Sequence, residues 1–322
     1  MILLVTSAED LTTDYLIRRL EERKLPFFRF NTEETVSGFD VSLSLTSEST
    51  QFSITDLIRG VELKSTDVSG AYFRRPGQPR TASENETESM FSRRELEETL
   101  RSLWRMIPER TWLNHPERIW LANNKIKQLI LAHEAGFKIP DTLVSSHSKK
   151  VLEFIGSHRN DAISKPVKHG FFNSDNGANL IFTDVITAEE LVQLEGCGQI
   201  VPAIVQPHLE KKLDLRITVV GELVFPVAIY SQEHVETSTD WRTWDIIEGI
   251  DLKHERFDLP NDITDRCLAL NKKLGLNFSC IDMVLTTSND FVFLEVNPNG
   301  QWAWIESLVG FAIRDAIIDQ LM

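Results

Sequence analysis

Two apolar segments near the C-terminal end, separated by a short polar stretch, restrict the fold of this chain more than any other feature. Residues 279–285 and 291–296 are typical of strands, and the polar turn between them predicts a neighbouring pair. Glu295 and Asn297 lie two residues apart on the second strand, so their side chains share one face. Asp282 lies on the first strand and can face them. The chain must therefore form a sheet in which carboxylates interrupt apolar strands.

These three polar residues predict a magnesium site. The carboxylates of Asp282 and Glu295 and the amide oxygen of Asn297 are hard ligands, which suit Mg²⁺ that keeps waters and phosphate oxygens as its other ligands. A polar strand face at the rim of a sheet is the alternative, and the trio alone favours it. The apolar neighbours of Glu295 and Asn297 favour the metal site, and so does Pro298, because ligands commonly lie at strand ends.

Two lysines lie where they could neutralise phosphate oxygens. Lys125 falls within a helix predicted over residues 117–136, where apolar residues recur at helical spacing. Lys165 closes an apolar strand at residues 162–165, directly before Pro166, which is not an ideal position for a solvated side chain. For either lysine alone, an ordinary surface residue is the better interpretation.

The segment that follows residue 200 combines a strand, a linker and alternating charges. The apolar strand ends near Gln206 and leads into Leu209 and Glu210, and such an exit can offer backbone groups to an adenine edge. Asp214 and Arg216 alternate along the next predicted strand and therefore share a face. The segment is a candidate nucleotide-binding hinge, and it offers several acidic residues for the ribose contact.

Two further segments allow more than one interpretation. Arg242 lies between Trp241 and Trp244, where it could steady a negative acyl phosphate or stack on either ring. Residues 167–177 place two glycines around a polar and aromatic stretch between predicted strands. A mobile lid over phosphates and a plain hairpin loop fit this composition equally well.

The rest of the chain indicates an α/β protein of two or three lobes, since 322 residues usually form more than one domain. Residues 2–5, 10–24 and 27–30 have the pattern of a strand, a helix and a strand. The loop after the first strand contains no glycine, which excludes a P-loop or a dinucleotide fingerprint there. Residues 305–321 predict one amphipathic helix, and a first lobe is expected to end near Asn114.

Composition excludes several classes of partner. The formal net charge is −14 and the pI is about 5.1, so we expect no binding to nucleic acid or to a membrane surface. The three cysteines have no metal-ligand spacing and form no disulfide framework. We expect a cytoplasmic protein, because the chain shows no signal-peptide pattern and no apolar run of spanning length.

Taken in order over residues 114–310, these features resemble the ATP-grasp enzymes. The order is Asn-Lys in a helix, Lys-Pro after a strand, a lid loop, a hinge, Asp-x-Arg, then Asp and Glu-x-Asn-Pro on paired strands. Within that superfamily the chain is most similar to the graspetide synthetases, the microviridin-type ribosomal peptide maturases. The segments that carry this similarity are residues 72–76, 112–116, 136–142, 240–242 and 293–304.

The resemblance implies an α/β protein with an ATP-grasp fold in three lobes. Residues 1–114 would form an N-terminal α/β lobe that contributes to peptide binding. Residues 115–204 would form a central lobe with the phosphate lid, and residues 205–322 a C-terminal grasp lobe with the magnesium site. ATP would bind between the last two lobes.

The same resemblance implies a function and assigns roles to residues. An Asp or Glu side chain of a ribosomal precursor peptide, which has a leader and an acidic core, would be phosphorylated by ATP. A Ser, Thr or Lys side chain of the same peptide would then attack, forming a macrocyclic ester or amide. Arg216 and Arg242 would stabilise the acyl phosphate, and magnesium would bind Asp282, Glu295 and Asn297. The residues expected to bind ATP are Lys125, Lys165, Gln206, Leu209, Glu210 and Asp214.

Several alternatives stay open at this stage. An ATP-grasp amino-acid ligase of the ribosomal-protein glutamate ligase type would use the same chemistry with free glutamate as the nucleophile. A non-catalytic ATP-binding regulator is the other rival, and the family's tendency to dimerise allows a homodimer. Arg74 and Arg75 are candidates to bind the acidic peptide, because local positive charge must offset the acidic background. The alternative for this pair is a bridge between lobes through surface salt links.

Overall fold

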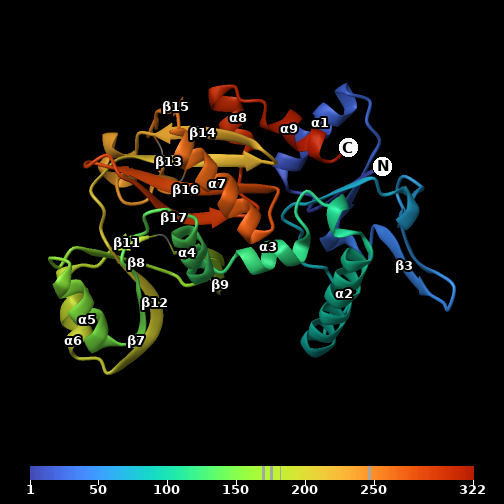
Figure 1. The fold of residues 1–322 in the computed structure, drawn as a ribbon. Coiled ribbons are helices and arrows are strands. Elements are labelled where there is room, and N and C mark those ends of the chain that lie inside the picture. Colours follow the sequence, from blue (N-terminus) through green and yellow to red (C-terminus); the bar gives the residue numbers. More distant parts are fainter. Residues whose placement is uncertain (169–170, 175–176, 182, 246, 248) are drawn as a thin grey trace.

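The structure is a computed structural model that describes residues 1–168, 171–174, 177–181, 183–245, 247 and 249–322 (Figure 1). A parallel sheet of order β2-β1-β6 begins the chain, with α1 connecting its first two strands. Helix α1 starts where it does because the Asp10 side chain accepts a hydrogen bond from the Thr12 amide and so caps it. These elements are β1 (Ile2–Thr6), α1 (Leu11–Glu22), β2 (Phe27–Asn31) and β6 (Gly70–Phe73). The predicted strand, helix and strand are confirmed.

A small antiparallel sheet and a long helix complete the N-terminal region. The sheet has the order β3-β4-β5, formed by β3 (Phe39–Leu45), β4 (Thr50–Asp56) and β5 (Val61–Lys64). Helix α2 (Glu86–Met106) packs on this side of the molecule, with Leu100, Leu103 and Trp104 buried. Phe30, Phe39 and Trp104 belong to a hydrophobic cluster that is confined to the N-terminal region.

The helix predicted over residues 117–136 is wrong in one respect, because the chain forms two helices there. They are α3 (Pro116–Ala122) and α4 (Lys125–Glu134). The side chain of Asn124 accepts a hydrogen bond from the Lys127 amide at 2.9 Å, which caps a new helix and separates it from the first. Lys125 consequently occupies the first turn of α4.

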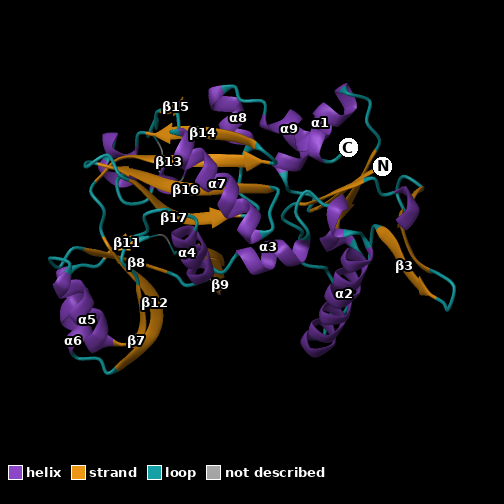
Figure 2. Cartoon of the chain, in the orientation of Figure 1, coloured by secondary structure: helices purple, strands orange, loops and turns teal. Residues whose placement is uncertain are grey.

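The central part of the chain forms an antiparallel sheet of order β11-β8-β12-β7, with two helices beside it (Figure 2). The predicted lid at residues 167–177 includes one short strand, Phe171–Ser174, and the first residue of the strand Gly177–Leu180, which pairs with it antiparallel. Residues 169–170 and 175–176 lie outside the described part. The elements are β7 (Leu143–His147), α5 (Ser148–Ser157), β8 (Ala162–Lys165), β9 (Phe171–Ser174), β10 (Gly177–Leu180), β11 (Asp184–Val185), α6 (Ala188–Glu195) and β12 (Gln199–Pro207).

A five-stranded antiparallel sheet of order β15-β14-β13-β16-β17 forms the C-terminal region, and α7 covers one of its faces (Figure 1). Its elements are β13 (Lys211–Val220), β14 (Leu223–Ile229), β15 (His254–Arg256), α7 (Asn261–Leu274), β16 (Phe278–Thr286) and β17 (Phe291–Asn297). Two helices follow, α8 (Ala303–Val309) and α9 (Ile313–Gln320). The single helix predicted over residues 305–321 is therefore wrong: Gly310 adopts φ +70° and ends the first helix.

The N-terminal and C-terminal regions share one hydrophobic core. Helix α1 packs against α9, where Arg19 binds Asp315 with an Nε to Oδ1 distance of 2.8 Å. The Trp302 indole donates a hydrogen bond to the Tyr72 hydroxyl at 3.2 Å, and both side chains are buried. Leu16 of α1 and Ile317 of α9 belong to the same apolar cluster. The lobe boundaries at 114/115 and 204/205 stay a prediction.

Asn114 ties the first region to the C-terminal sheet. Its amide nitrogen donates to the carbonyls of Phe278 and Pro298 at 2.7 and 3.0 Å. Its Oδ1 atom accepts from the amides of Asn277 and Phe278 at 2.8 and 3.0 Å. The end of β17, where the candidate metal site lies, is thereby fixed to the preceding region. In the described part of the chain, no helix combines the length and apolar character needed to cross a bilayer.

Candidate functional site

Three charged residues lie in one row across the C-terminal sheet. Arg216 of β13 is paired with Asp282 of β16, which is paired in turn with Glu295 of β17. Nη1 of Arg216 donates to both carboxylate oxygens of Asp282, at 2.8 and 2.7 Å. Burial raises the pKa of Asp282 and Arg216 only partly offsets this, whereas Asp282 raises the pKa of Arg216 despite its burial. The row therefore contains a buried ion pair, and one side of this pair can contact a ligand.

Glu295 is the point on which cations from three elements converge. The Lys125 ammonium of α4 lies 3.1 Å from Oε2, and Nη1 of Arg242 lies 3.7 Å from Oε1. Burial would raise the pKa of Glu295, but Lys125, Lys165 and Arg242 outweigh it and lower the pKa to about 2. The carboxylate is therefore ionised at any physiological pH.

A glutamine that the sequence analysis missed positions helix α4 over this row. Nε2 of Gln128 donates to the carbonyls of Ala122 and Val296 at 2.6 and 2.8 Å. Its Oε1 atom accepts from the Val296 amide at 2.9 Å. These bonds dock the first turn of α4 on β17, which brings Lys125 to Glu295. The only signal in the sequence is a polar residue on the apolar stripe of the helix.

Lys165 closes β8 and has almost no contact with solvent. Its residue is 8% exposed, and burial lowers the pKa of its ammonium to about 8, although Glu295 acts in the opposite direction. A buried ammonium is costly unless an anion accompanies it. The position therefore suits a ligand that brings negative charge, and the predicted role as a phosphate contact stays a prediction with this support.

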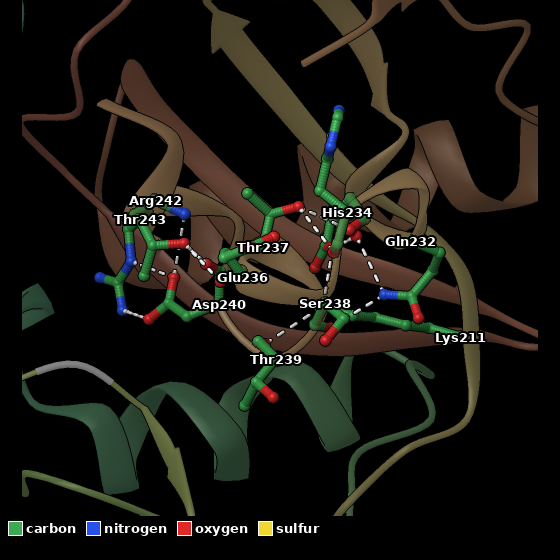
Figure 3. A network of polar contacts seen from close by, with 12 residues as sticks. Lys211, Gln232, His234, Glu236, Thr237, Ser238, Thr239, Asp240, Arg242 and Thr243 are labelled. Atoms are coloured by element: carbon green, nitrogen blue, oxygen red, sulfur yellow. Dashed lines mark hydrogen bonds and ion pairs between the residues drawn. The ribbon is translucent and has the colours of Figure 1, made fainter. Parts of the chain in front are cut away.

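Arg242 is held by a compact polar network in the segment between β14 and β15 (Figure 3). Asp240 accepts hydrogen bonds from Nε and Nη2 of Arg242 at 2.8 and 2.5 Å, and from the Thr183 amide at 3.2 Å. Burial would raise the pKa of Asp240, but the hydrogen bonds to Arg242 outweigh it and lower the pKa. Lys211 donates to the carbonyl of Thr239 at 3.2 Å and so attaches the segment to β13. The guanidinium is thus held near the row, with Nη1 3.7 Å from Oε1 of Glu295, although the side chain is 43% exposed.

Asp214 is enclosed by protein groups. The Lys211 ammonium lies 2.7 Å from its Oδ2 atom, and the Ser231 hydroxyl donates to the same oxygen. Burial raises the pKa of Asp214, and Lys211 only partly offsets the increase. Asp214 lines a small cavity together with Lys165 and Glu295, so its predicted contact with ATP stays a prediction.

Two adjoining cavities, of about 80 and 40 Å³, lie between β12 and the C-terminal sheet. Gln206 lines both, and Leu209 lines the smaller one. Nε2 of Gln206 donates to the Thr142 hydroxyl at 2.9 Å, while its Oε1 atom is buried without a hydrogen-bond partner in the described structure. An unpaired buried acceptor suits a ligand that donates a hydrogen bond, as the amino group of adenine does. Glu210 is exposed and lines neither cavity.

The residues predicted to bind magnesium lie on adjacent strands. Asp282 and Glu295 are directly opposite each other, and Asn297 follows two residues later on the same strand. Nowhere in the described ranges do three or more His, Cys, Asp or Glu side chains gather as a metal site, so an amide oxygen would have to be the third ligand. Oδ1 of Asn299 is buried and has no hydrogen-bond partner among the residues that the structure describes. This oxygen-only donor set fits magnesium whose other ligands are waters and phosphate oxygens.

The two neighbouring arginines of the N-terminal region have opposite environments. Arg74 is completely buried, and it donates hydrogen bonds to the carbonyl of Asn299 and, at 2.6 Å, to Oε1 of Gln301. Its Nε atom lies 3.9 Å from Oδ2 of Asp10. A bridge between the N-terminal and C-terminal regions therefore fits Arg74 better than the predicted peptide contact, because its guanidinium cannot reach solvent. Arg75 is exposed, and its predicted peptide contact stays a prediction.

Comparison with known proteins identifies the family. Residues 122–321, more than half of the chain, match the model of the RimK-like ATP-grasp domain. The chain belongs to the RimK-like ATP-grasp family. No curated protein sequence matches this ATP-grasp protein.

Three solved structures resemble the ATP-grasp protein over nearly its whole length. Macrocyclase MdnC from Microcystis aeruginosa MRC, bound with precursor peptide MdnA, is 28% identical with a TM-score of 0.85, and the match covers 99% of this chain and 98% of that one. A RiPP-associated ATP-grasp ligase from Chryseobacterium gregarium, in complex with ADP and a leader and core peptide, is 26% identical with a TM-score of 0.87 and coverages of 99% and 96%. Macrocyclase MdnB from Microcystis aeruginosa MRC is 26% identical with a TM-score of 0.79 and coverages of 100% and 98%.

These matches confirm the predicted ATP-grasp fold and the predicted resemblance to graspetide synthetases. The protein is an ATP-grasp ligase, as the sequence predicts, and enzymes of this family use ATP. The similarity to the macrocyclases also includes the first 121 residues, which the family model does not cover. That region is therefore part of the likeness and not an unrelated addition.

Proposed function

We propose that this ATP-grasp ligase activates an Asp or Glu side chain of a ribosomal precursor peptide and joins it to a Ser, Thr or Lys side chain of the same peptide. The observation that carries the proposal is the likeness of the whole chain, N-terminal region included, to macrocyclases whose structures hold precursor peptides. The charged row at Glu295 supports it, because its cations can bind phosphate.

In the first step, an oxygen of the peptide carboxylate attacks the γ-phosphorus of ATP, and the bond to the β-phosphate oxygen breaks to release ADP. Lys125 and Lys165 would bind phosphate oxygens, since both already converge on the anion Glu295. Asp282, Glu295 and Asn297 would hold magnesium, which supplies charge neutralisation on the β- and γ-phosphates when bound. The product is an acyl phosphate on the peptide.

In the second step, a hydroxyl or amine of the same peptide attacks the acyl carbon. The carbon–oxygen bond to phosphate breaks, phosphate leaves, and the proton of the nucleophile goes to the departing phosphate. Arg216 and Arg242 would stabilise the negative charge that develops, because both are fixed in place by carboxylates before any ligand binds. Nε of Arg216 is buried without a hydrogen-bond partner in the described structure and can donate to that charge.

The nucleotide would lie with its adenine between β12 and the C-terminal sheet. The unpaired Oε1 atom of Gln206 would accept from the adenine amino group, with Leu209 packing beside it. Glu210 and Asp214 stay the candidates to bind the ribose, although Asp214 already forms an ion pair with Lys211. A homodimer and a cytoplasmic setting stay predictions as well.

One experiment separates this function from its rivals. The protein is incubated with ATP, magnesium and an acidic peptide that also contains Ser, Thr and Lys side chains, and in parallel with free glutamate. A macrocyclase releases ADP and phosphate, and the peptide loses the mass of one water for each bond formed. A glutamate ligase would instead add the mass of a glutamate residue, and a regulator would release no ADP. Release of AMP and pyrophosphate would contradict the acyl-phosphate mechanism.

A further inference from the structure

A cavity of about 470 Å³ lies beside the end of β17, on the N-terminal side of the candidate metal site. We call it the N-terminal cavity. Its walls come from the segment at residues 75–79, from α2 and from α3, and Asn297 and Asn299 close one end. The strand that carries Glu295 thus continues into this cavity. Asn297, two residues after Glu295, connects this cavity with the candidate metal site.

Arg75 supplies the cavity with a cation that forms no ion pair within the described part of the chain. The residue is exposed, lines the cavity, and makes no ion pair or hydrogen bond with any described residue. It also adopts φ +46°, a conformation that non-glycine residues rarely hold and that clusters at functional sites. Of the titratable residues that line the cavity, Arg75 and Arg101 are positive and Glu97 is negative. The cavity therefore complements a ligand that carries negative charge.

Aromatic side chains form another part of the cavity wall. Phe73, Trp104 and Trp120 line it, and the rings of Phe73 and Trp120 meet edge to face with centroids 6.2 Å apart. Trp120 is 40% exposed, and the guanidinium of Arg101 lies 5.3 Å from its ring centroid. Arg101 also pairs with Glu98 at 3.7 Å, so Arg75 is the cation left for an acidic side chain. The exposed tryptophan suits an apolar side chain near it.

We propose that the N-terminal cavity is a recognition subsite for the precursor peptide. Arg75 binds an acidic side chain, and Trp120 packs against an apolar or aromatic side chain near it in the peptide sequence. The carboxylate undergoing activation lies beyond Asn297, at Glu295. This inference rests on the proposed function, and it names the class of substrate: an acidic peptide in which aromatic and acidic residues lie close together.

Binding of short synthetic peptides tests the subsite without turnover. The probes are three capped pentapeptides: one containing glutamate and phenylalanine, one with glutamine in place of the glutamate, and one with alanine in place of the phenylalanine. Each is titrated calorimetrically into the full-length protein with ADP and magnesium. We expect the wild type to bind the first peptide about tenfold more tightly than either of the others.

Two variants and two matched controls assign the preferences. Arg75→Gln abolishes the preference for glutamate over glutamine, and Trp120→Ala abolishes the preference for phenylalanine over alanine. Arg110→Gln and Phe91→Ala keep both preferences, because these residues are exposed but lie outside the cavity. Thermal melts accompany each variant, so that an unfolded protein is recognised.

The outcomes separate the subsite from the proposed function. Equal binding of the three peptides by the wild type would overturn the subsite, and so would unchanged preferences in both variants. Either result would leave peptide-dependent ADP release as it was. Conversely, the proposed function fails if no peptide stimulates ADP release, whatever these titrations show.

Discussion

The charged row and the N-terminal cavity meet at the end of β17, and they hold their charges in opposite ways. In the row, Arg216 is paired with Asp282 and Lys125 with Glu295, so each cation has a fixed anionic partner before any ligand arrives. In the cavity, Arg75 has no such partner among the described residues. The reaction at phosphate is the same in every turnover, so it benefits from charged side chains that are already held in place before the ligand binds. A cation without an ion-pair partner can bind an acidic side chain of a peptide, so the open position of Arg75 suits the proposed recognition subsite.

The largest expected effect breaks the row by removing one member of its buried pair. Asp282→Asn leaves Arg216 charged and without its counterion in a buried position. We expect the free energy of unfolding of the ligand-free protein to fall by about 3 kcal/mol, measured by urea denaturation. The matched control is Asp290→Asn on the same hairpin, whose exposed pair with Lys138 should contribute nothing measurable. Equal stability of the two variants would show that the pair does not organise the row.

The next effect concerns the chemical step. Glu295→Gln removes the bridging anion that Lys125 and Arg242 face, and we expect kcat to fall on the order of a hundredfold or more. The fold and peptide binding should persist, because glutamine has the same shape and the N-terminal cavity is intact. A coupled ADP-release assay measures kcat, with Glu255→Gln, an exposed change on β15, as the control. Near-normal turnover in Glu295→Gln would contradict the assignment of Glu295 as a magnesium ligand.

A third effect follows from the buried ammonium of Lys165. Its pKa is about 8 in the free protein, because burial disfavours the charged form. Phosphate binds the protonated form of Lys165 and raises this pKa. The affinity for ATP is therefore highest below pH 8 and decreases as the pH rises through 8. We expect a loss of up to about tenfold per pH unit there, measured as the Kd for ATP between pH 7 and 9.5. Lys165→Arg stays charged and should flatten the profile; the same slope in both proteins would contradict the assignment.

The smallest expected effect distinguishes the two adjacent arginines, Arg74 and Arg75. Arg75→Gln should raise the peptide KM about tenfold, the loss expected for one charged hydrogen bond. Its melting temperature and its Kd for ATP should match those of the wild type. Arg74→Gln should instead lower the melting temperature, because Arg74 bonds Asn299 and Gln301 from a buried position. The reverse pattern would show that Arg74 is the peptide contact.

A feature of the site could be predicted from the sequence when it depends on residues that lie close together in the chain. The hairpin of β16 and β17 is predictable, because alternation along two short strands already places Asp282 and Glu295 on one face. The break before Lys125 is not, since the apolar periodicity continues through the cap at Asn124. A side chain that begins a new helix by accepting a hydrogen bond from one amide leaves almost no trace in a hydrophobic pattern.

The sequence could not predict which residues contact each other when they lie far apart in the chain. Arg74 and Arg75 are identical neighbours, and only the packing of β6 against the loop after β17 makes one a bridge and the other an exposed cation. The role of Gln128 is equally hard to predict, because Val296, its partner on β17, lies 168 residues away. Contacts of that kind depend on the completed fold, so local propensity and spacing carry no information about them.

An oxygen-transfer measurement tests the central claim most directly. The peptide carries ¹⁸O in the carboxylates of its core and is incubated with unlabelled ATP, magnesium and the wild-type protein. If the carboxylate attacks the γ-phosphorus and phosphate leaves in the second step, the phosphate released with each new bond contains one labelled oxygen. Phosphate without label, or label found in AMP, would contradict activation through an acyl phosphate.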